Sequence, residues 1–214
     1  MNKKTPIGRR RFKEVVNYYI SSGPITSYVA GLFKVGFPEA YAEYQEAFEA
    51  GRWIWVNEPE GAGWEDDGPW LNRAVVWKLQ LGMHLDKGDG GLTVTFPVGF
   101  FTGGAMELPQ LGTIFDRYFA GNVIITYAGQ FAHTVQDWKI SDHRLAADGT
   151  RIDCPEDILP GRVGSVYFNK QNVLRFCQGK TRGFFKANPL HVDPPQGKKK
   201  GANQSEKHRR RWAQ

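Results

Sequence analysis

The sequence predicts a mainly β fold, either a barrel or a sandwich, with helices packed against one face. Short runs rich in β-branched and aromatic residues follow one another from residue 53 onward, and glycine-rich turn clusters separate them. Glycine contributes 25 of the 214 residues, which favours many turns over long helices. Many short strands after one helical segment are typical of this architecture.

Two helical segments precede the strands, over residues 10–21 and 38–50. The second begins with Pro38 in its first turn and ends at Gly51. Its large apolar residues lie on one stripe, which consists of Tyr41, Tyr44 and Phe48. We expect this stripe to pack against the rest of the domain.

The strands are predicted from short runs of apolar or alternating residues. They are WIWV (53–56), AVVWKLQL (74–81), LTVTFPV (92–98), IFDRYF (114–119), NVIITYA (122–128), FAHTV (131–135) and RVGSVYF (162–168). A polar insertion interrupts them at residues 139–161. The predicted parts are 1–52, a basic arm with buttressing helices; 53–177, the β core; and 178–214, an extended segment with a disordered basic tail.

Positive charge gathers at the two ends of the chain. Residues 1–14 carry a net charge of +5 and residues 195–214 a net charge of +6, which leaves about −5 for the residues between them. Basic tails bind phosphate backbones or serve nuclear import, or they simply keep a terminus soluble. The basic pI therefore says little about the body of the protein.

Two cysteines, Cys154 and Cys177, are too few and too far apart for a disulfide framework. This usage favours an intracellular, reducing setting. No apolar run approaches 18 residues and no signal sequence is recognisable, so we expect neither a membrane span nor secretion.

A possible metal motif, His84-Leu85-Asp86, precedes a glycine-punctuated β-rich run. Side chains two residues apart at the end of a strand point the same way and converge on one ion. A second histidine, His133, follows the apolar strand 122–128. Two histidines and one carboxylate form the facial triad of non-haem Fe(II) oxygenases, whose opposite face stays open for a cosubstrate and oxygen.

Arg162 opens the predicted strand 162–168 and supplies a cation in the same frame. A guanidinium grips a carboxylate through two parallel hydrogen bonds, which suits the distal carboxylate of 2-oxoglutarate. The sequence thus contains the two histidines, the carboxylate and the arginine in the order that a 2-oxoglutarate oxygenase site requires, each beside a strand.

Three segments carry a resemblance to a known family: HLDKGDGGLTVTF, GGAMELPQLGTIFDRYFAGNVIITYAGQFAHTV and RVGSVYF. They resemble the double-stranded β-helix (jelly-roll, cupin-like) core of 2-oxoglutarate/Fe(II) dioxygenases. Within that superfamily they look like the TET and J-binding-protein group, which oxidises methyl groups on DNA bases, and the phrase GGAMELPQLG is similar to fungal members. The resemblance covers roughly residues 53–170.

The resemblance implies roles for single residues. His84, Asp86 and His133 would be the iron ligands, and Arg162 the 2-oxoglutarate anchor. Asp89 stands where animal TET enzymes have an asparagine that contacts the flipped base, and a carboxylate still accepts a hydrogen bond from the exocyclic amine of cytosine. The cysteine-rich zinc-binding segment of animal TET enzymes is absent, so their mode of duplex binding is not implied here.

Other residues compete for these roles. His143 is the alternative distal ligand and Arg144 the alternative cation, although His143 lies in the polar insertion. A second His-x-Asp at 191–193 sits in a proline-rich segment with no strand before the next histidine, which shows how little the triplet means alone. Three tryptophans either stack on a base or pack in the core: Trp70, Trp77 and Trp138.

We expect a nuclear DNA 5-methylcytosine (or thymine methyl) dioxygenase that uses Fe(II), 2-oxoglutarate and O₂, with the basic termini aiding contact with DNA. An oxygenase of the same fold that acts on a protein side chain or a small molecule is the alternative, and the acidic body favours it. A degenerate, non-catalytic copy is the third hypothesis, and the intact set of four site residues argues against it.

Overall fold

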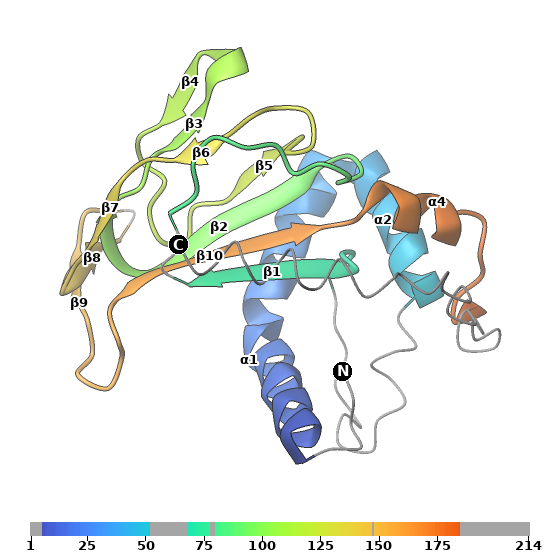
Figure 1. The fold of residues 1–214 in the computed structure, drawn as a ribbon, viewed down its shortest axis with the longest axis horizontal. Helices are drawn as coiled ribbons and strands as arrows, with labels where there is room; N and C mark the ends of the chain where they lie inside the picture. The colour runs from blue at the N-terminus through green and yellow to red at the C-terminus, as the bar shows by residue number, and fades with distance from the viewer. Residues whose placement is uncertain (1–5, 52–67, 78–79, 147, 185–214) are drawn as a thin grey trace, which may run out of the picture.

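The computed structural model describes residues 6–51, 68–77, 80–146 and 148–184 (Figure 1). The predicted strand 53–56, the His-x-Asp triplet at 191–193 and the basic tail lie outside the described residues. None of the described helices is both long and apolar enough to cross a membrane.

Helix α1 (Pro6–Gly36) is much longer than the predicted segment 10–21. The pattern weakens at Gly23 and Pro24, two residues of low helix propensity that nevertheless lie inside the helix. The helix continues because Val29 and Phe33, on the following turns, are fully buried in the core. Tertiary burial of an apolar face outweighs local propensity here.

Helix α2 (Pro38–Gly51) confirms the predicted segment 38–50. Its stripe packs as expected, because Tyr44 and Phe48 are buried and Tyr41 packs against the main core. Phe33 of α1 lies 5.5 Å from Tyr44 and 6.3 Å from Tyr41 between ring centroids, so aromatic rings join the two helices.

The strands form two sheets and a hairpin, and all their pairings are antiparallel. The large sheet has the order β1 (Asn72–Trp77), β10 (Gly161–Phe168), β2 (Thr93–Gly103), β5 (Ile124–Thr126), with β7 (Trp138–Ile140) paired to the end of β2. The small sheet has the order β4 (Thr113–Phe115), β3 (Met106–Leu108), β6 (Thr134–Val135). The hairpin is β8 (His143–Leu145) with β9 (Arg151–Asp153); η2 (Pro109–Leu111) and α4 (Gln171–Cys177) complete the described elements.

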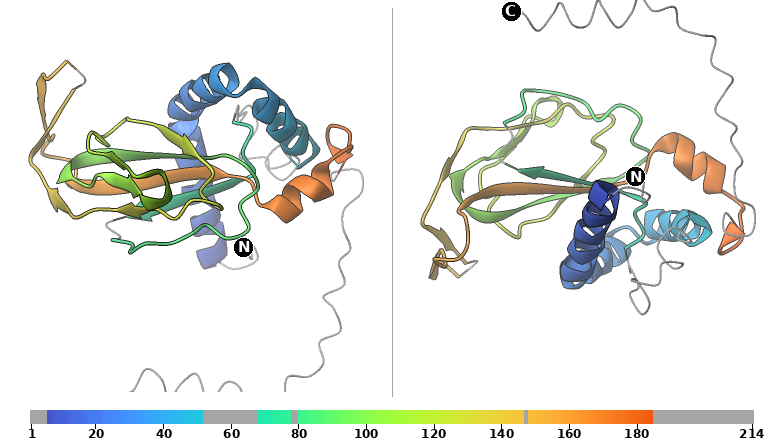
Figure 2. Two further views of the ribbon diagram at one scale, coloured as in Figure 1. Left: turned by 90° about the horizontal axis from the view of Figure 1, so that it is seen from above. Right: turned by 60° about the horizontal axis from the view of Figure 1, so that its bottom comes forward.

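One face of the large sheet packs against the helices, and the other lines a cavity. Alternate side chains of a strand point to opposite faces of a sheet. One face carries Tyr167 of β10 and Val94 and Phe96 of β2, which belong to the core beneath the helices. The other face carries Thr95 and Val166, which line a cavity on the side of the small sheet. Helices therefore lie along one face, and the small sheet lies over the other (Figures 1 and 2).

The predicted fold class is confirmed: the chain is mainly β with flanking helices, and its two facing antiparallel sheets form a jelly-roll-like core. Some elements differ from the prediction. The predicted strand 114–119 is reduced to β4 and a turn, and the polar insertion 139–161 contains most of β7 and the whole β8–β9 hairpin. The three-residue strand β3 and the seven-residue helix α4 were not among the predicted elements.

Gly99 is the position where a side chain would damage the large sheet most directly. It pairs with Arg162 in the β2–β10 register, its φ is +109°, and an added Cβ would lie 2.2 Å from the carbonyl oxygen of Gly161. Gly99→Ala should lower the free energy of unfolding by more than about 1 kcal/mol, measured by urea denaturation. Gly112→Ala is the matched control, because Gly112 has φ +58° with no atom within 4 Å of the added Cβ. Equal losses in the two variants would show that the backbone clash has no effect.

Candidate metal centre

His84 and His133 are held side by side by their own backbones. The N–H of His84 donates to the carbonyl of His133 at 3.0 Å, and the N–H of His133 donates back at 2.9 Å. These bonds form an isolated antiparallel bridge, which brings the two imidazole centroids to 4.4 Å. The threonine after His133 reinforces the contact, since the hydroxyl of Thr134 donates to the carbonyl of Leu81 at 2.9 Å.

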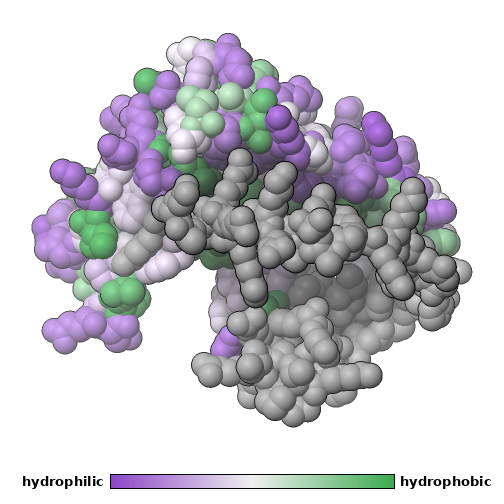
Figure 3. Space-filling view, in the orientation of Figure 1, coloured by the Kyte–Doolittle hydropathy of each residue, from purple (hydrophilic) through white to green (hydrophobic). Residues whose placement is uncertain are grey.

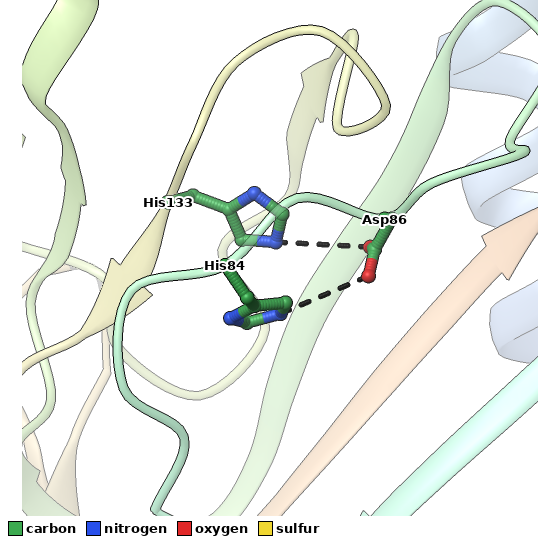
Figure 4. Close-up of side chains that lie close together, drawn as sticks. All are labelled: His84, Asp86 and His133. Carbon is green, nitrogen blue, oxygen red and sulfur yellow. Dashed lines mark ion pairs between the residues drawn. The ribbon is translucent and has the colours of Figure 1, made fainter.

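Asp86 completes the group from the same loop as His84. Its backbone N–H donates to the carbonyl of Ala128 at 3.0 Å, which fixes the loop beside the strand that leads to His133. Its two carboxylate oxygens then face one imidazole each: Oδ1 lies 3.7 Å from Nε2 of His84, and Oδ2 lies 3.7 Å from Nε2 of His133 (Figure 4).

Hydrogen bonds at the far side of each ring set the tautomer of the two histidines. Nδ1 of His84 lies 2.8 Å from the carbonyl oxygen of Gly82, and Nδ1 of His133 lies 3.1 Å from that of Phe131. A carbonyl oxygen only accepts, so each Nδ1 carries a proton, and each ring directs its Nε2 toward Asp86. Metal-bound histidines show the same arrangement, in which the second ring nitrogen donates to a backbone carbonyl.

The geometry and the donor set fit a divalent cation. One ligand atom from each of the three residues lies within 4.8 Å of the others. Two ligands about 2.1 Å from one ion lie roughly 3 to 4 Å apart, which matches the 3.7 Å separations seen here. Imidazole nitrogens and a carboxylate oxygen are a donor set that Fe(II) and similar divalent cations accept. The three residues therefore form a candidate metal site of the two-histidine, one-carboxylate type.

A cavity of about 260 Å³ opens beside these residues. It lies between the sheets, because Ala74 of β1 and Val166 of β10 line one side and Met106 of β3 and Val135 of β6 the other. Its walls are mainly apolar, whereas hydrophilic residues cover much of the coloured outer surface in Figure 3. An apolar cavity with a few convergent polar groups is the usual form of a small-molecule site.

Arg162 reaches the same cavity and has no charged partner among the described residues. Its side chain is buried, with 6% of the residue exposed. Its Nε–H is buried without a hydrogen-bond acceptor, and none of the described carboxylates forms an ion pair with it. Burial lowers the pKa of the guanidinium from its ordinary value, although a nearby tyrosine opposes the shift. A buried, uncompensated cation is costly, and an anionic ligand would offset that cost.

Glycines and aromatic rings shape the space around Arg162. An added Cβ at Gly104 would lie 3.5 Å from its Nε, and one at Gly164 would lie 3.5 Å from its Nη1. The guanidinium carbon lies 5.6 Å from the ring centroids of both Phe101 and Tyr118, within range of cation–π attraction. Burial raises the pKa of Tyr118 to about 12, so its hydroxyl stays neutral.

Asp89 also lines the cavity, but its carboxylate is engaged within the protein. The side chain is only 2% exposed and forms an ion pair with Lys170 through Oδ1. The hydroxyl of Thr93 donates to Oδ2 at 3.3 Å. Burial raises the pKa of this carboxyl above its ordinary value, and the hydrogen bond and charge of Lys170 oppose the rise. The contact of Asp89 with a base stays a prediction.

The competing candidates lie elsewhere. His143 and Arg144 are on β8, where His143 pairs with Asp142 and Arg144 lies 5.7 Å from the ring centroid of Phe100. Neither residue lines the cavity, and neither do the three tryptophans. Trp70 is 1% exposed and packs between Phe33 and Tyr167, which makes it a core residue.

Sequence reasoning overlooked Lys170. Counting in steps of two from Arg162 gives residues 164, 166, 168 and 170, and all of these line the cavity. The alternation of side chains along β10 therefore contained the signal, but it continues beyond the end of the strand at Phe168.

The similarity of this chain to known proteins lies in its structure. No family model matches the chain, and no curated protein matches its sequence. Among solved structures, the chain is similar to "NgTET1 in complex with 5mC DNA", with 14% sequence identity and a TM-score of 0.49. The match covers 80% of this chain and 54% of that one, so the chain spans about half the length of that protein.

Removal of one ligand should greatly weaken metal binding. His84→Ala should weaken Mn(II) binding by more than about 100-fold in titration calorimetry, because loss of a ligand exceeds the roughly 10–100-fold effect of changing a group behind the ligands. His143→Ala is the matched control and should bind Mn(II) like the unaltered protein. The same affinity in both variants would reject the triad.

Proposed function

We propose that this chain is a 2-oxoglutarate- and Fe(II)-dependent dioxygenase that oxidises the methyl group of a nucleic-acid base, 5-methylcytosine in DNA. One observation supports the reaction class most strongly. Arg162, which is buried and has no ion-pair partner among the residues that the structure describes, lines the same cavity as the triad of His84, Asp86 and His133. A metal site and a fixed cation that share one apolar cavity suit a cosubstrate with a chelating end and a distal carboxylate.

The net reaction joins two oxidations. 2-Oxoglutarate loses CO₂ and becomes succinate, which receives one oxygen atom of O₂, and the methyl group receives the other as a hydroxyl. Bound iron would supply the activation of O₂. His84, Asp86 and His133 would hold the metal on one side, while Arg162 fixes the orientation of 2-oxoglutarate and the apolar walls exclude water.

The nucleic-acid substrate is supported by the sequence resemblance and the charge distribution. A base in a duplex must leave the stack to enter a cavity, which costs on the order of a few kcal/mol. The strongly basic ends of the chain would offset part of this cost through phosphate contacts, so binding should weaken as salt rises. Membership of the TET and J-binding-protein group, its fungal-type branch and a nuclear location belong to the same proposal.

Methylated DNA tests the substrate directly. The iron-loaded protein with 2-oxoglutarate and O₂ should convert 5-methylcytosine into hydroxymethyl, formyl or carboxyl cytosine, detected by mass spectrometry of digested DNA. Unmethylated DNA of the same sequence is the control. Succinate production without any oxidised base would reject DNA as the substrate and leave an oxygenase that acts on a protein side chain or a small molecule.

Arg162 and Arg144 can be compared as anchors for the cosubstrate. Arg162→Gln removes a buried charged partner, a loss of roughly 2–5 kcal/mol, so the KM for 2-oxoglutarate should rise by at least ~30-fold. Arg144→Gln removes an arginine outside the cavity and should leave this KM unchanged. Succinate production at varied 2-oxoglutarate concentration measures both. The reverse ranking would assign the anchor to Arg144.

A further inference from the structure

The turn that carries Asp86 has little regular structure of its own. Residues 85–88 form no strand or helix, although the metal ligand Asp86 lies among them. A carboxylate must be aimed within a fraction of an ångström to serve a metal, so contacts from elsewhere in the chain must fix this turn. Two backbone bonds close the turn: the N–H of Lys87 donates to the carbonyl of Leu85 at 2.9 Å, and the N–H of Asp89 donates to the carbonyl of Asp86 at 3.0 Å.

Asp89 is fastened in turn to the segment that leaves β10. It forms an isolated antiparallel bridge with Lys170. Two flanking bonds extend this bridge: the N–H of Gly90 donates to the carbonyl of Asn169 at 2.7 Å, and the N–H of Gln171 donates to the carbonyl of Gly88 at 2.9 Å. The Asp86 turn is thereby attached to the same strand that carries Arg162.

The side chains of Asp89 and Lys170 add an ion pair to this backbone bridge. The Asp89 side chain is 2% exposed and the Lys170 side chain 39% exposed, so the carboxylate depends on the ammonium for its charge balance. The charge of Asp86 also acts on Asp89, as a second carboxylate nearby. Without Lys170, the buried Asp89 carboxylate would lose its ion-pair partner, and the turn would lose its side-chain link to the segment that follows β10.

The residues beyond the turn have a separate support. The hydroxyl of Tyr44, on α2, contacts the carbonyl oxygen of Gly90 and lies 2.9 Å from that of Leu92. A Cβ added at Gly91 would lie 2.7 Å from this hydroxyl, which shows how closely the helix approaches. Tyr44 therefore secures the start of β2, and the ion pair acts on the Asp86 turn itself.

We propose that Asp89 and Lys170 are a positioning pair for the metal centre, which holds the Asp86 carboxylate toward the Nε2 atoms of the two histidines. This inference rests on the proposed metal-dependent function, and it gives Asp89 a positioning role in the Asp86 turn. Neither residue touches the ion. Their effect passes through the backbone bond between Asp89 and Asp86.

Metal affinity tests the pair without any need for turnover. Lys170→Met and Asp89→Asn should each weaken Mn(II) binding by roughly 10–100-fold in titration calorimetry, the usual effect of losing a group behind a metal ligand. The double variant should bind no more weakly than the worse single variant, because both changes remove one interaction. Lys170→Arg keeps the charge and should recover most of the affinity. The electron paramagnetic resonance spectrum of bound Mn(II) should change in the two single variants.

An ion pair away from the cavity provides the matched control. Arg182 pairs with Glu49 of α2 at 2.7 Å, and neither lines the cavity. Arg182→Met should leave the Mn(II) affinity and spectrum unchanged. Circular dichroism at the titration temperature confirms that each variant is folded. If Lys170→Met is unfolded, the Mn(II) affinities and spectra of Lys170→Arg and Asp89→Asn test the positioning role instead.

Two outcomes separate this inference from the proposed function. Equal Mn(II) affinities and spectra for the unaltered protein, Lys170→Met and Asp89→Asn would overturn the positioning role and leave the metal centre intact. An unaltered protein that binds no Mn(II) would instead overturn the metal centre, and the positioning role with it.

Discussion

Two backbone hydrogen bonds between His84 and His133 hold the site together. They join a loop before β2 to the loop before β6, and they place the two imidazoles 4.4 Å apart between centroids. The candidate metal centre depends on this bridge, because Asp86 faces both imidazoles only when they are held side by side. The hydrogen bond of each Nδ1 to a backbone carbonyl then fixes the orientation of each ring, so that both Nε2 atoms face the same carboxylate.

The two faces of the large sheet make different contacts, and the sheet thereby links the site to the rest of the fold. Toward the helices, Tyr167 and Val94 contribute to a hydrophobic core with Phe33. Toward the small sheet, the alternate residues of the same strands leave a cavity, with Arg162 near one end of β10 and Lys170 just past the other. Packing on one face thus fixes the positions of charged groups on the other, which is why a site of mostly loop residues has a defined shape.

Much of this arrangement was predictable from the sequence, and the rest was not for physical reasons. Strand periodicity gave the longest strands, β2 and β10, and the order of histidines, carboxylate and arginine gave the candidate site. Helix α1 exceeded its prediction because burial of Val29 and Phe33 overrides the low propensity of Gly23 and Pro24. The alternation along β10 extends to Lys170, but its pairing with Asp89 is a contact between residues 81 positions apart, which no local pattern encodes.

The most direct measurement is an X-ray anomalous-difference map from crystals soaked with Mn(II) and 2-oxoglutarate. The proposed site requires one strong peak bounded by Nε2 of His84, Nε2 of His133 and the carboxylate of Asp86. It also requires density for the dicarboxylate in the cavity, with its distal end on Arg162. Absence of a peak at the triad, or a peak at another set of side chains such as Asp142 and His143, would contradict the account.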